Sequence, residues 1–488
     1  MSKSAIEGLE PKLVWEYFYG ITQVPRPSKK EEKIRAHVRE FAAKNNFNFE
    51  EDEVGNIVIK VPATPGYESA PTIVIQGHLD MVCEKNKGTE HDFDNDPIEI
   101  MRDGDWITAS GTTLGADNGI GVAAGMAAAT DDSVVHGPLE LLCTIDEETG
   151  MTGVNALRSD FITGKTLLNL DSEEDGAFYV GCSGGQDTRG DFAVNYTDAD
   201  RSLTAYEIMI TGLKGGHSGL DIANGRANAI RLLAQLLNRL KAEVEFDLSA
   251  ISGGSLRNAI PREAEVTILL NSEDETKVKG IIDRFISDTL LEFNVNDPGL
   301  EIKFEKKDSD NDKVFTKEFV DNLVRVLLAT PHGIMAMSPD IPGLVETSTN
   351  LATIDVTDDK LTIGTSQRSA IDSAKWNISN AVRAVFELGG ADNVDTGDGY
   401  PGWQPNMDSQ LLKISKEVYK EMFNGEPEIK AIHAGLETGL LGSKYPGLDM
   451  ISFGPTIEGA HSPDEKLNIP ATAKFYDLLK GILLRYTK

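Results

Sequence analysis

The order of strand-like and helix-like segments along the 488 residues is the feature that most constrains the fold. In the first 190 residues, apolar runs that suit buried strands alternate with helical patterns. The expected helices cover 12–20, 30–45 and Gly119–Thr130, and the expected strands are Asn56–Lys60, Thr72–Gln76, Leu139–Ile145 and Lys165–Leu170. Such alternation favours an α/β sheet that is covered by helices on both faces.

A different pattern begins near residue 188. Half-exposed strands are expected at Ala205–Thr211, Glu263–Leu270, Leu300–Phe304, 343–356 and 359–369, and amphipathic helices over 224–242, 277–292 and 371–388. This order favours an antiparallel sheet with helices on one face.

The α/β pattern returns after a segment rich in Gly, Asp and Pro, Gly389–Pro405, which indicates a boundary. The expected elements there are a helix over 409–423, a strand at Asp449–Phe453 and a helix over 470–486. We therefore predict a doubly wound α/β domain with a mixed sheet, formed by residues 1–187 and 397–488. An α+β domain over 188–396 interrupts it.

The charge of the chain excludes several classes of partner. Lys plus Arg is 47 and Asp plus Glu is 78, which gives a net charge of −31. Phosphate backbones and anionic lipid surfaces would repel such a chain, so we expect neither nucleic-acid nor membrane partners. The sequence shows no apolar run of membrane-spanning length and no apolar signal region, and its three cysteines cannot form a disulfide framework. A cytoplasmic location is the simplest expectation.

Five segments each place a histidine or a carboxylate at one edge of the predicted α/β sheet. They are Gly77-His78-Leu79-Asp80, Gly115-Ala116-Asp117-Asn118-Gly119, Asp146-Glu147-Glu148, Asp171 and His461-Ser462-Pro463-Asp464-Glu465. Each alone is as well explained by a helix cap or a solvated side chain. Because ligands of open α/β sheets bind beyond the carboxyl ends of strands, the five together predict a metal site.

The donor types suit Zn²⁺, Mn²⁺ or Co²⁺, because two imidazoles are combined with carboxylates and no thiolate. A pair of ions needs a bridging carboxylate, and Asp117 between Gly115 and Gly119 is the best candidate. One ion would then take His78 and Asp171, and the other Glu148 and His461. One member of the pair Glu147 and Glu148 would bind metal, and the other would take a proton from the activated water. Asp80 would accept the second ring N–H of His78.

These residues resemble the dinuclear metallopeptidases of the aminoacylase and carboxypeptidase group. Longer strings resemble the cytosolic aminoacyl-histidine dipeptidase branch of that group, and the similarity runs from end to end. The strings are Gly77-His78-Leu79-Asp80-Met81-Val82, Gly111-Thr112-Thr113-Leu114-Gly115-Ala116-Asp117-Asn118-Gly119-Ile120-Gly121, Arg257-Asn258-Ala259-Ile260-Pro261-Arg262, Tyr400-Pro401-Gly402-Trp403-Gln404-Pro405, His433-Ala434-Gly435-Leu436-Glu437 and His461-Ser462-Pro463-Asp464-Glu465.

The resemblance implies metal-dependent hydrolysis of short unblocked peptides, above all Xaa-His dipeptides. It makes Glu147 the general base, Asp117 the bridging ligand and Asp80 the residue that orients His78. The terminal ligands would be His78, Glu148, Asp171 and His461. It also implies a cis peptide between Asp117 and Asn118, and two divalent ions, with zinc expected first and cobalt or manganese as alternatives.

The resemblance further implies that the inserted domain is a lid. His217, in the loop Gly215-Gly216-His217-Ser218-Gly219, would stabilise the oxyanion. Asn258 and Arg368 would bind the substrate carboxylate, although a surface salt bridge explains Arg368 equally well. His433 and Glu437 would line the substrate pocket, where Glu437 would meet the free amino group or else cap a helix. A homodimer formed through the lid is a further expectation.

Two other functions compete with this one. A related amidohydrolase, either an N-acyl amino acid deacylase or a tripeptide exopeptidase, would use the same metal residues. A catalytically inactive metal-binding protein would be expected to have lost at least one member of the set. Cys83 departs from the family pattern, which often has proline there: it would either trap zinc as a thiolate or serve as a small buried side chain.

Overall fold

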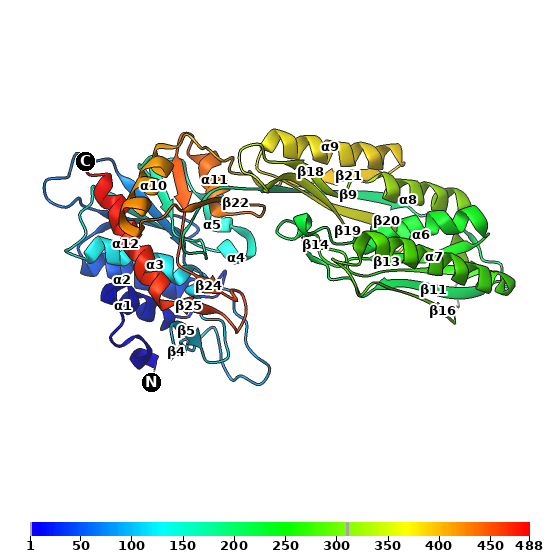
Figure 1. Ribbon diagram of the computed structural model, residues 1–488, viewed down its shortest axis with the longest axis horizontal. Helices are drawn as coiled ribbons and strands as arrows, with labels where there is room; N and C mark the ends of the chain where they lie inside the picture. The colour runs from blue at the N-terminus through cyan, green and yellow to red at the C-terminus, as the bar shows by residue number, and fades with distance from the viewer. Residues whose placement is uncertain (1, 309–311) are drawn as a thin grey trace. The chain divides into compact units, whose positions relative to one another are not determined.

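The computed structural model describes residues 2–308 and 312–488, which form two compact units. The first unit comprises Met1–Gly181, Trp403–Ala431 and Leu436–Lys488. The second comprises Cys182–Gly402 and Ile432–Gly435. The blue and red ends of the chain therefore belong to one unit, as Figure 1 shows. None of the helices in the described part of the chain combines the length and the hydropathy that a membrane span requires.

The first unit is built on a sheet with the strand order β1-β2-β6-β3-β7-β23-β8-β22, which has eight strands within the described residues. These strands are β1 (Asn48–Glu51), β2 (Ile57–Val61), β3 (Ile73–His78), β6 (Leu139–Thr144), β7 (Thr166–Asn169), β8 (Ala177–Cys182), β22 (Glu428–Ile432) and β23 (Asp449–Ser452). β3 is parallel to β6 and β7, and β7 is parallel to β23. β2 is antiparallel to β1 and β6, and β8 is antiparallel to β23. Every residue of β3 and β6 is buried, as expected for parallel strands covered on both faces.

The remaining elements of this unit are its helices and a smaller sheet with the order β24-β25-β5-β4. The helices are α1 (Lys12–Thr22), α2 (Glu32–Lys44), α3 (Ala116–Thr130), α4 (Glu147–Gly150), α5 (Thr152–Ala156), α10 (Gln410–Phe423), α11 (Glu437–Lys444) and α12 (Ile469–Arg485). The strands are β4 (Ile100–Asp103), β5 (Trp106–Ala109), β24 (Ile457–Glu458) and β25 (Lys466–Asn468).

Helix α3 consists mainly of small residues because it packs directly against the central strands. A Cβ atom at Gly125 would lie 3.3 Å from Cγ2 of Ile75 in β3. A Cβ atom at Gly121 would lie only 2.3 Å from the carbonyl oxygen of Leu170. The sequence therefore brings the start of α3, and Asp117 with it, close to the end of β7.

The second unit contains an antiparallel sheet with the order β16-β11-β15-β13-β19-β20-β9-β21, and β18 also pairs with β19. The strands are β9 (Gly184–Ala193), β11 (Thr204–Thr211), β13 (Asp247–Gly253), β15 (Ala264–Leu270), β16 (Glu301–Lys306), β18 (Gly333–Met337), β19 (Val345–Thr357), β20 (Lys360–Ser369) and β21 (Asn393–Thr396). Two short pairs join β10 (Tyr196–Asp198) with β17 (Lys313–Phe315) and β12 (Gly216–His217) with β14 (Ala259–Ile260).

Among the described residues of this unit, four helices pack with the sheet around one hydrophobic core: α6 (Ala229–Glu243), α7 (Glu275–Phe293), α8 (Lys317–Ala329) and α9 (Asp372–Leu388). Figure 1 shows α6, α7 and α8 in green and α9 in yellow beside the strands. The predicted fold class, a mixed-sheet α/β unit formed by both chain ends and an inserted α+β unit with an antiparallel sheet, is confirmed.

The structure also contains elements that the sequence pattern did not indicate. β9 carries Gly, Gln, Asp and Arg instead of an apolar alternation, and it is a strand because it pairs with β20 over ten residues. Within the segment interpreted as a boundary, β21 pairs with β9. Tertiary pairing, which a local pattern does not report, determines both strands.

Candidate metal centre

The parallel register of the first sheet brings the predicted metal residues to one edge. His78 is the last residue of β3 and lies opposite Thr144, the last residue of β6. Glu147 and Glu148 follow β6 after two residues, and Asp171 follows β7 after one. The carboxyl ends of these strands point the same way, so the three loops emerge side by side.

His78, Asp117 and Asp171 form one cluster. Nε2 of His78 lies 3.0 Å from Oδ1 of Asp117 and 3.3 Å from Oδ1 of Asp171. His461, Asp117 and Glu148 form a second cluster, in which Nε2 of His461 lies 3.2 Å from Oδ2 of Asp117 and 3.1 Å from Oε2 of Glu148. In each cluster the three donor atoms lie within 4.8 Å of one another. Asp117 thus offers one carboxylate oxygen to each cluster.

Backbone geometry presents Asp117 to both clusters. Asp117 and Asn118 depart from helical dihedral angles inside the first turn of α3, with ψ of 114° at Asp117. The Asp117–Asn118 peptide is cis, as the family resemblance implies. The side-chain amide of Asn118 donates to the carbonyl oxygen of Leu170 at 2.6 Å, which ties this turn to the segment before Asp171.

The donor set fits divalent cations. Oε1 of Glu148 and Oδ1 of Asp171 are buried, and neither accepts a hydrogen bond from the residues that the structure describes. Hydrogen bonds to Asp117 and Glu148 raise the pKa of His461 to about 11, and burial raises the pKa of Asp171 to about 7. Excess negative charge around two imidazoles is the environment in which a cation displaces protons.

Asp80 connects His78 with the turn that carries Glu147 and Glu148. One oxygen lies 3.4 Å from Nδ1 of His78. The carboxylate also accepts the backbone N–H groups of Glu147 at 3.1 Å and Glu148 at 3.2 Å, and the hydroxyl of Ser28 at 2.7 Å. Burial favours the neutral acid, but contacts with His78 and these donors lower the pKa of Asp80 to about 2. Asp80 is therefore an ionised acceptor that orients both neighbours.

Glu147 is half-buried, and its carboxylate lies within 4.8 Å of donor atoms of His78 and Glu148. Burial, reinforced by the charges of Asp171, Glu437 and Glu148, raises its pKa well above the usual value. A carboxyl group whose pKa is raised by burial and by neighbouring negative charges binds a proton more readily than an exposed one.

Glu437 is fully buried in the first unit, at the start of α11. Its Oε2 accepts hydrogen bonds from the side chains of Gln76 at 2.6 Å and Thr144 at 2.7 Å. Burial raises its pKa to about 8. Gln76 belongs to β3, which ends at His78, and Thr144 ends β6, which precedes Glu147 and Glu148. Glu437 therefore lies between the strand ends that carry these metal residues.

The second unit brings His217, Arg368 and His433 together. A Cβ atom on Gly219 would lie 2.0 Å from the carbonyl oxygen of His433 and 3.1 Å from both the Arg368 and His217 side chains. Nε2 of His433 lies 2.7 Å from the hydroxyl of Ser348. The side chain of Asn258 is exposed, and its backbone carbonyl accepts from the N–H of Ser218.

Tyr400 joins this group, although the sequence analysis gave it no role. Its hydroxyl accepts a hydrogen bond from Nη1 of Arg368 at 2.9 Å. Its ring lies between Gly185 and Gly435, where an added Cβ atom would stand 2.6 Å and 2.8 Å from ring atoms. The only sequence signal was its place in the Tyr400-Pro401-Gly402-Trp403-Gln404-Pro405 string.

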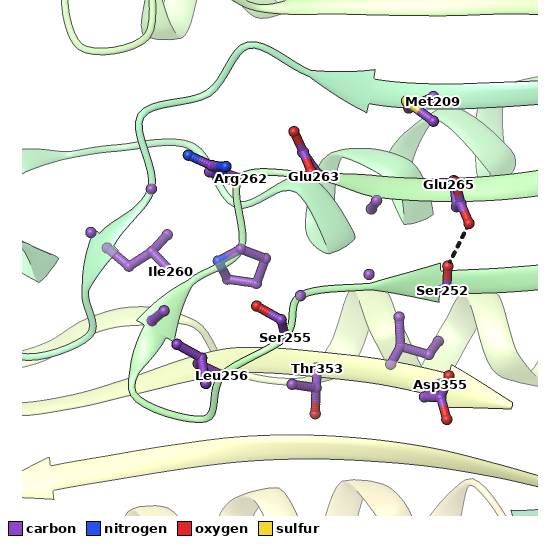
Figure 2. A pocket seen from close by; sticks show the side chains of 18 of the residues that line it. Met209, Ser252, Ser255, Leu256, Ile260, Arg262, Glu263, Glu265, Thr353 and Asp355 are labelled. Atoms are coloured by element: carbon purple, nitrogen blue, oxygen red, sulfur yellow. Dashed lines mark hydrogen bonds between the residues drawn. The ribbon is translucent and has the colours of Figure 1, made fainter. Parts of the chain in front are cut away.

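A cavity of about 840 Å³ lies elsewhere in the second unit, beside β13, β15 and β19 (Figure 2). Ser252 donates a hydrogen bond to Glu265 in its wall. Its charged lining residues are Lys214, Arg262, Glu263, Glu265 and Asp355. None of the predicted site residues is among the described residues that line this cavity.

Comparison with known proteins gives consistent matches. Residues 74–485 match the profile of "Peptidase family M20/M25/M40". The cytosol non-specific dipeptidase of Escherichia coli (strain K12) is 39% identical over 480 residues, which cover 98% of this chain and 99% of the relative. The crystal structure of aminoacylhistidine dipeptidase from Vibrio alginolyticus superposes with a TM-score of 0.91, at 40% identity and 99% coverage of both chains. The aminopeptidase PepT of Bacillus cereus ATCC 10987 shares the fold, with a TM-score of 0.58 at 17% identity over 98% of this chain and 100% of that one.

Proposed function

The chain belongs to peptidase family M20/M25/M40 and is a peptide-bond hydrolase, and from this premise we propose how it selects and cleaves its substrate. We propose that it hydrolyses unblocked dipeptides, with Xaa-His dipeptides preferred, at a dinuclear metal centre in which Glu147 is the general base. The observation that carries this proposal is the placement of Asp117, whose two carboxylate oxygens each face a different histidine.

The residues of the two clusters would hold the ions: His78 and Asp171 one, Glu148 and His461 the other, and Asp117 both. Two divalent ions bound there would lower the pKa of water and stabilise negative charge on the scissile carbonyl oxygen. Zinc is the first expectation, and cobalt or manganese are alternatives that the same donors accept.

Glu147 would take a proton from the attacking water and return it to the leaving nitrogen. Its raised pKa supports this role, because it helps the carboxyl group to keep the proton between the two steps. Asp80 would keep Glu147 in place through the backbone N–H that it accepts, and would fix the ring of His78.

The cluster in the second unit supports an anion-binding role. The side chain of Arg368 is buried, and its contacts among the described residues are two hydroxyl groups and an imidazole, not a carboxylate. Nδ1 of His217 accepts the backbone N–H groups of Gly219 and Leu220, so its proton lies on Nε2. That nitrogen is 3.5 Å from Nη2 of Arg368, which places two donors together without an acceptor between them.

We therefore propose that Arg368, with Asn258, binds the free carboxylate of the substrate, and that His217 donates to the oxyanion. Burial next to the Arg368 charge lowers the pKa of His217 to about 4, so the imidazole is a neutral donor at pH 7. His433 would line the substrate pocket. Glu437 would support the strands that carry the metal residues, through its hydrogen bonds with Gln76 and Thr144. Binding through a free carboxylate favours dipeptides over substrates whose carboxylate is blocked.

The names of two relatives indicate different substrate ranges. The relative from Escherichia coli is called non-specific, whereas the one from Vibrio alginolyticus is named for aminoacylhistidine. We propose preference for Xaa-His within a broader range of dipeptides, and the cytosol as the compartment. An N-acyl amino acid deacylase or a tripeptide exopeptidase is the alternative, which a panel of Xaa-His, N-acetyl amino acids and tripeptides distinguishes.

The deciding experiment measures hydrolysis of Ala-His by chelator-stripped protein before and after addition of Zn²⁺, Mn²⁺ or Co²⁺. Glu147→Gln is measured alongside, with Glu148→Gln as the matched neighbour. We expect activity to return with metal, Glu147→Gln to take up metal but lose at least about a hundredfold in kcat, and Glu148→Gln to lose metal uptake itself. Metal uptake by the unaltered protein without cleavage of Ala-His would overturn the dipeptidase proposal.

A further inference from the structure

Glu465 holds the segment that carries Asp117. Its Oε2 accepts the backbone N–H groups of Leu114 at 2.7 Å and Gly115 at 2.9 Å. Its Oε1 accepts those of Ala116 at 2.7 Å and Asp117 at 3.3 Å. Glu465 is 2% exposed, so solvent does not compete for these bonds.

Arg26 binds the other side of the same segment. Its Nη2 donates to the carbonyl oxygen of Gly115 in a short hydrogen bond. Its Nη1 donates to the carbonyl oxygens of Leu79 at 3.0 Å and Asp80 at 2.7 Å. Arg26 is also 2% exposed. Burial lowers its pKa, and the nearby negative charge of Glu465 opposes that effect.

Together the two side chains connect three loops that carry metal residues. Arg26 ties the end of β3, with His78, to the loop before α3. Glu465 ties that loop to the segment that contains His461, four residues away. An ordinary helix cap comes from a neighbouring residue, whereas Glu465 is 348 positions from Asp117 in the sequence. These contacts therefore fix long-range geometry rather than a local turn.

We propose that Arg26 and Glu465 are positioning residues that hold the Asp117 carboxylate between the His78 cluster and the His461 cluster. This inference rests on the proposed dinuclear function. A bridging carboxylate must face both ions at once, so a small displacement of its loop weakens the binding of both. Residues that support metal ligands commonly change metal affinity about 10- to 100-fold when they are replaced.

The test is titration of chelator-stripped protein with Zn²⁺, followed by calorimetry, for Glu465→Gln and Arg26→Lys. Gln turns one of the two acceptor oxygens into a donor that faces backbone N–H groups. Lys keeps the charge but cannot reach Leu79, Asp80 and Gly115 together. Asp464→Asn is the control, because it removes a charge from the same loop at an exposed position. We expect at least one stepwise dissociation constant to rise about 10- to 100-fold in both test variants and to stay unchanged in the control.

A purely structural role predicts a different result. It would lower the melting temperature of the metal-free variants but leave the dissociation constants of the folded protein unchanged, and that result would overturn the proposal. Arg26→Lys decides the question if Glu465→Gln does not fold, and failure of both to fold would also count against positioning. The unaltered protein separates the two proposals: normal zinc binding without Ala-His cleavage rejects the dipeptidase activity, whereas uptake of fewer than two ions rejects the dinuclear centre.

Discussion

Asp80 illustrates how one side chain serves both ligand and base. Its carboxylate contacts the His78 ring and accepts the N–H groups of Glu147 and Glu148. An Asn side chain would present an amide donor to one of these N–H groups. We expect Asp80→Asn to lower kcat/KM about 10- to 100-fold while the zinc-loaded protein stays folded. Steady-state kinetics with Ala-His measures this, and an effect below threefold would contradict it.

The same residue predicts a pH dependence of stability. The pKa of Asp80 is about 2 in the folded protein, below the ordinary value of about 3.9. A lowered pKa gives stability that is complete above about pH 5 and is lost as the pH falls toward 2, on the order of 2 kcal/mol in all. In metal-stripped protein, the gap in unfolding free energy between wild type and Asp80→Asn should therefore narrow from pH 6 to pH 3. A gap that stays constant across this range would contradict the prediction.

Cys83 supplies a further prediction at this scale. Its Sγ lies 3.6 Å from the carbonyl oxygen of Met81, and burial raises its pKa to about 11. A thiol of that pKa is protonated at pH 7, which favours the role of a small half-buried side chain over zinc trapping. We expect slow alkylation by iodoacetamide at pH 7.5, followed by mass spectrometry, and Cys83→Ala activity within twofold of wild type. Rapid alkylation, or loss of zinc in Cys83→Ala, would restore the zinc-trapping interpretation.

The sequence indicated the metal residues because they follow a rule of chain direction. His78, Glu147, Glu148 and Asp171 come after strands that run parallel, so their order along the chain predicts that they meet. Arg26 and Glu465 obey no such rule, since their partners are backbone groups of distant loops. Which backbone a buried charge will meet depends on tertiary packing, and a sequence pattern does not contain that information.

At the scale of elements, helix α3 gives a matched pair of substitutions. An added methyl at Gly121 would lie 2.3 Å from the backbone oxygen of Leu170, whereas one at Gly125 would meet the Ile75 side chain at 3.3 Å. We expect Gly121→Ala to cost about 1–3 kcal/mol through overpacking and to weaken zinc binding. Gly125→Ala should stay within about 1 kcal/mol of wild type, because it gains helix propensity. Urea unfolding measures both, and equal costs at the two positions would contradict the packing argument.

Elements with a strong apolar period were predictable, and those defined by a partner were not. β3 and α3 stood out through buried runs and small residues. β9 and β21 are polar strands whose structure comes from pairing with β20 and with each other. Their conformation therefore depends on strands that are distant in the sequence.

At the scale of the whole molecule, the proposed metal residues all belong to the first unit. Each unit has its own sheet, so zinc should stabilise the first one selectively. Differential scanning calorimetry should show two transitions, of which only one moves upward with zinc. The stabilisation should be about 2.7 kcal/mol for each ion at a hundred times its dissociation constant. A uniform shift of the whole profile would contradict independent units. Limited proteolysis on the same samples tests whether the domain limits lie at 187/188 and 396/397, as the sequence predicts, or at 181/182 and 402/403, where the two compact units divide.

Because the first unit is formed by both ends of the chain, its residues are not synthesised together. Asp117 leaves the ribosome 344 residues before His461, an interval of roughly 20 to 70 seconds at typical translation rates. Cys182–Gly402 emerges within that interval and forms a unit of its own. A nascent chain therefore lacks His461, one of the five proposed ligands, until translation is nearly finished, and the His461 cluster is completed only at the end of synthesis.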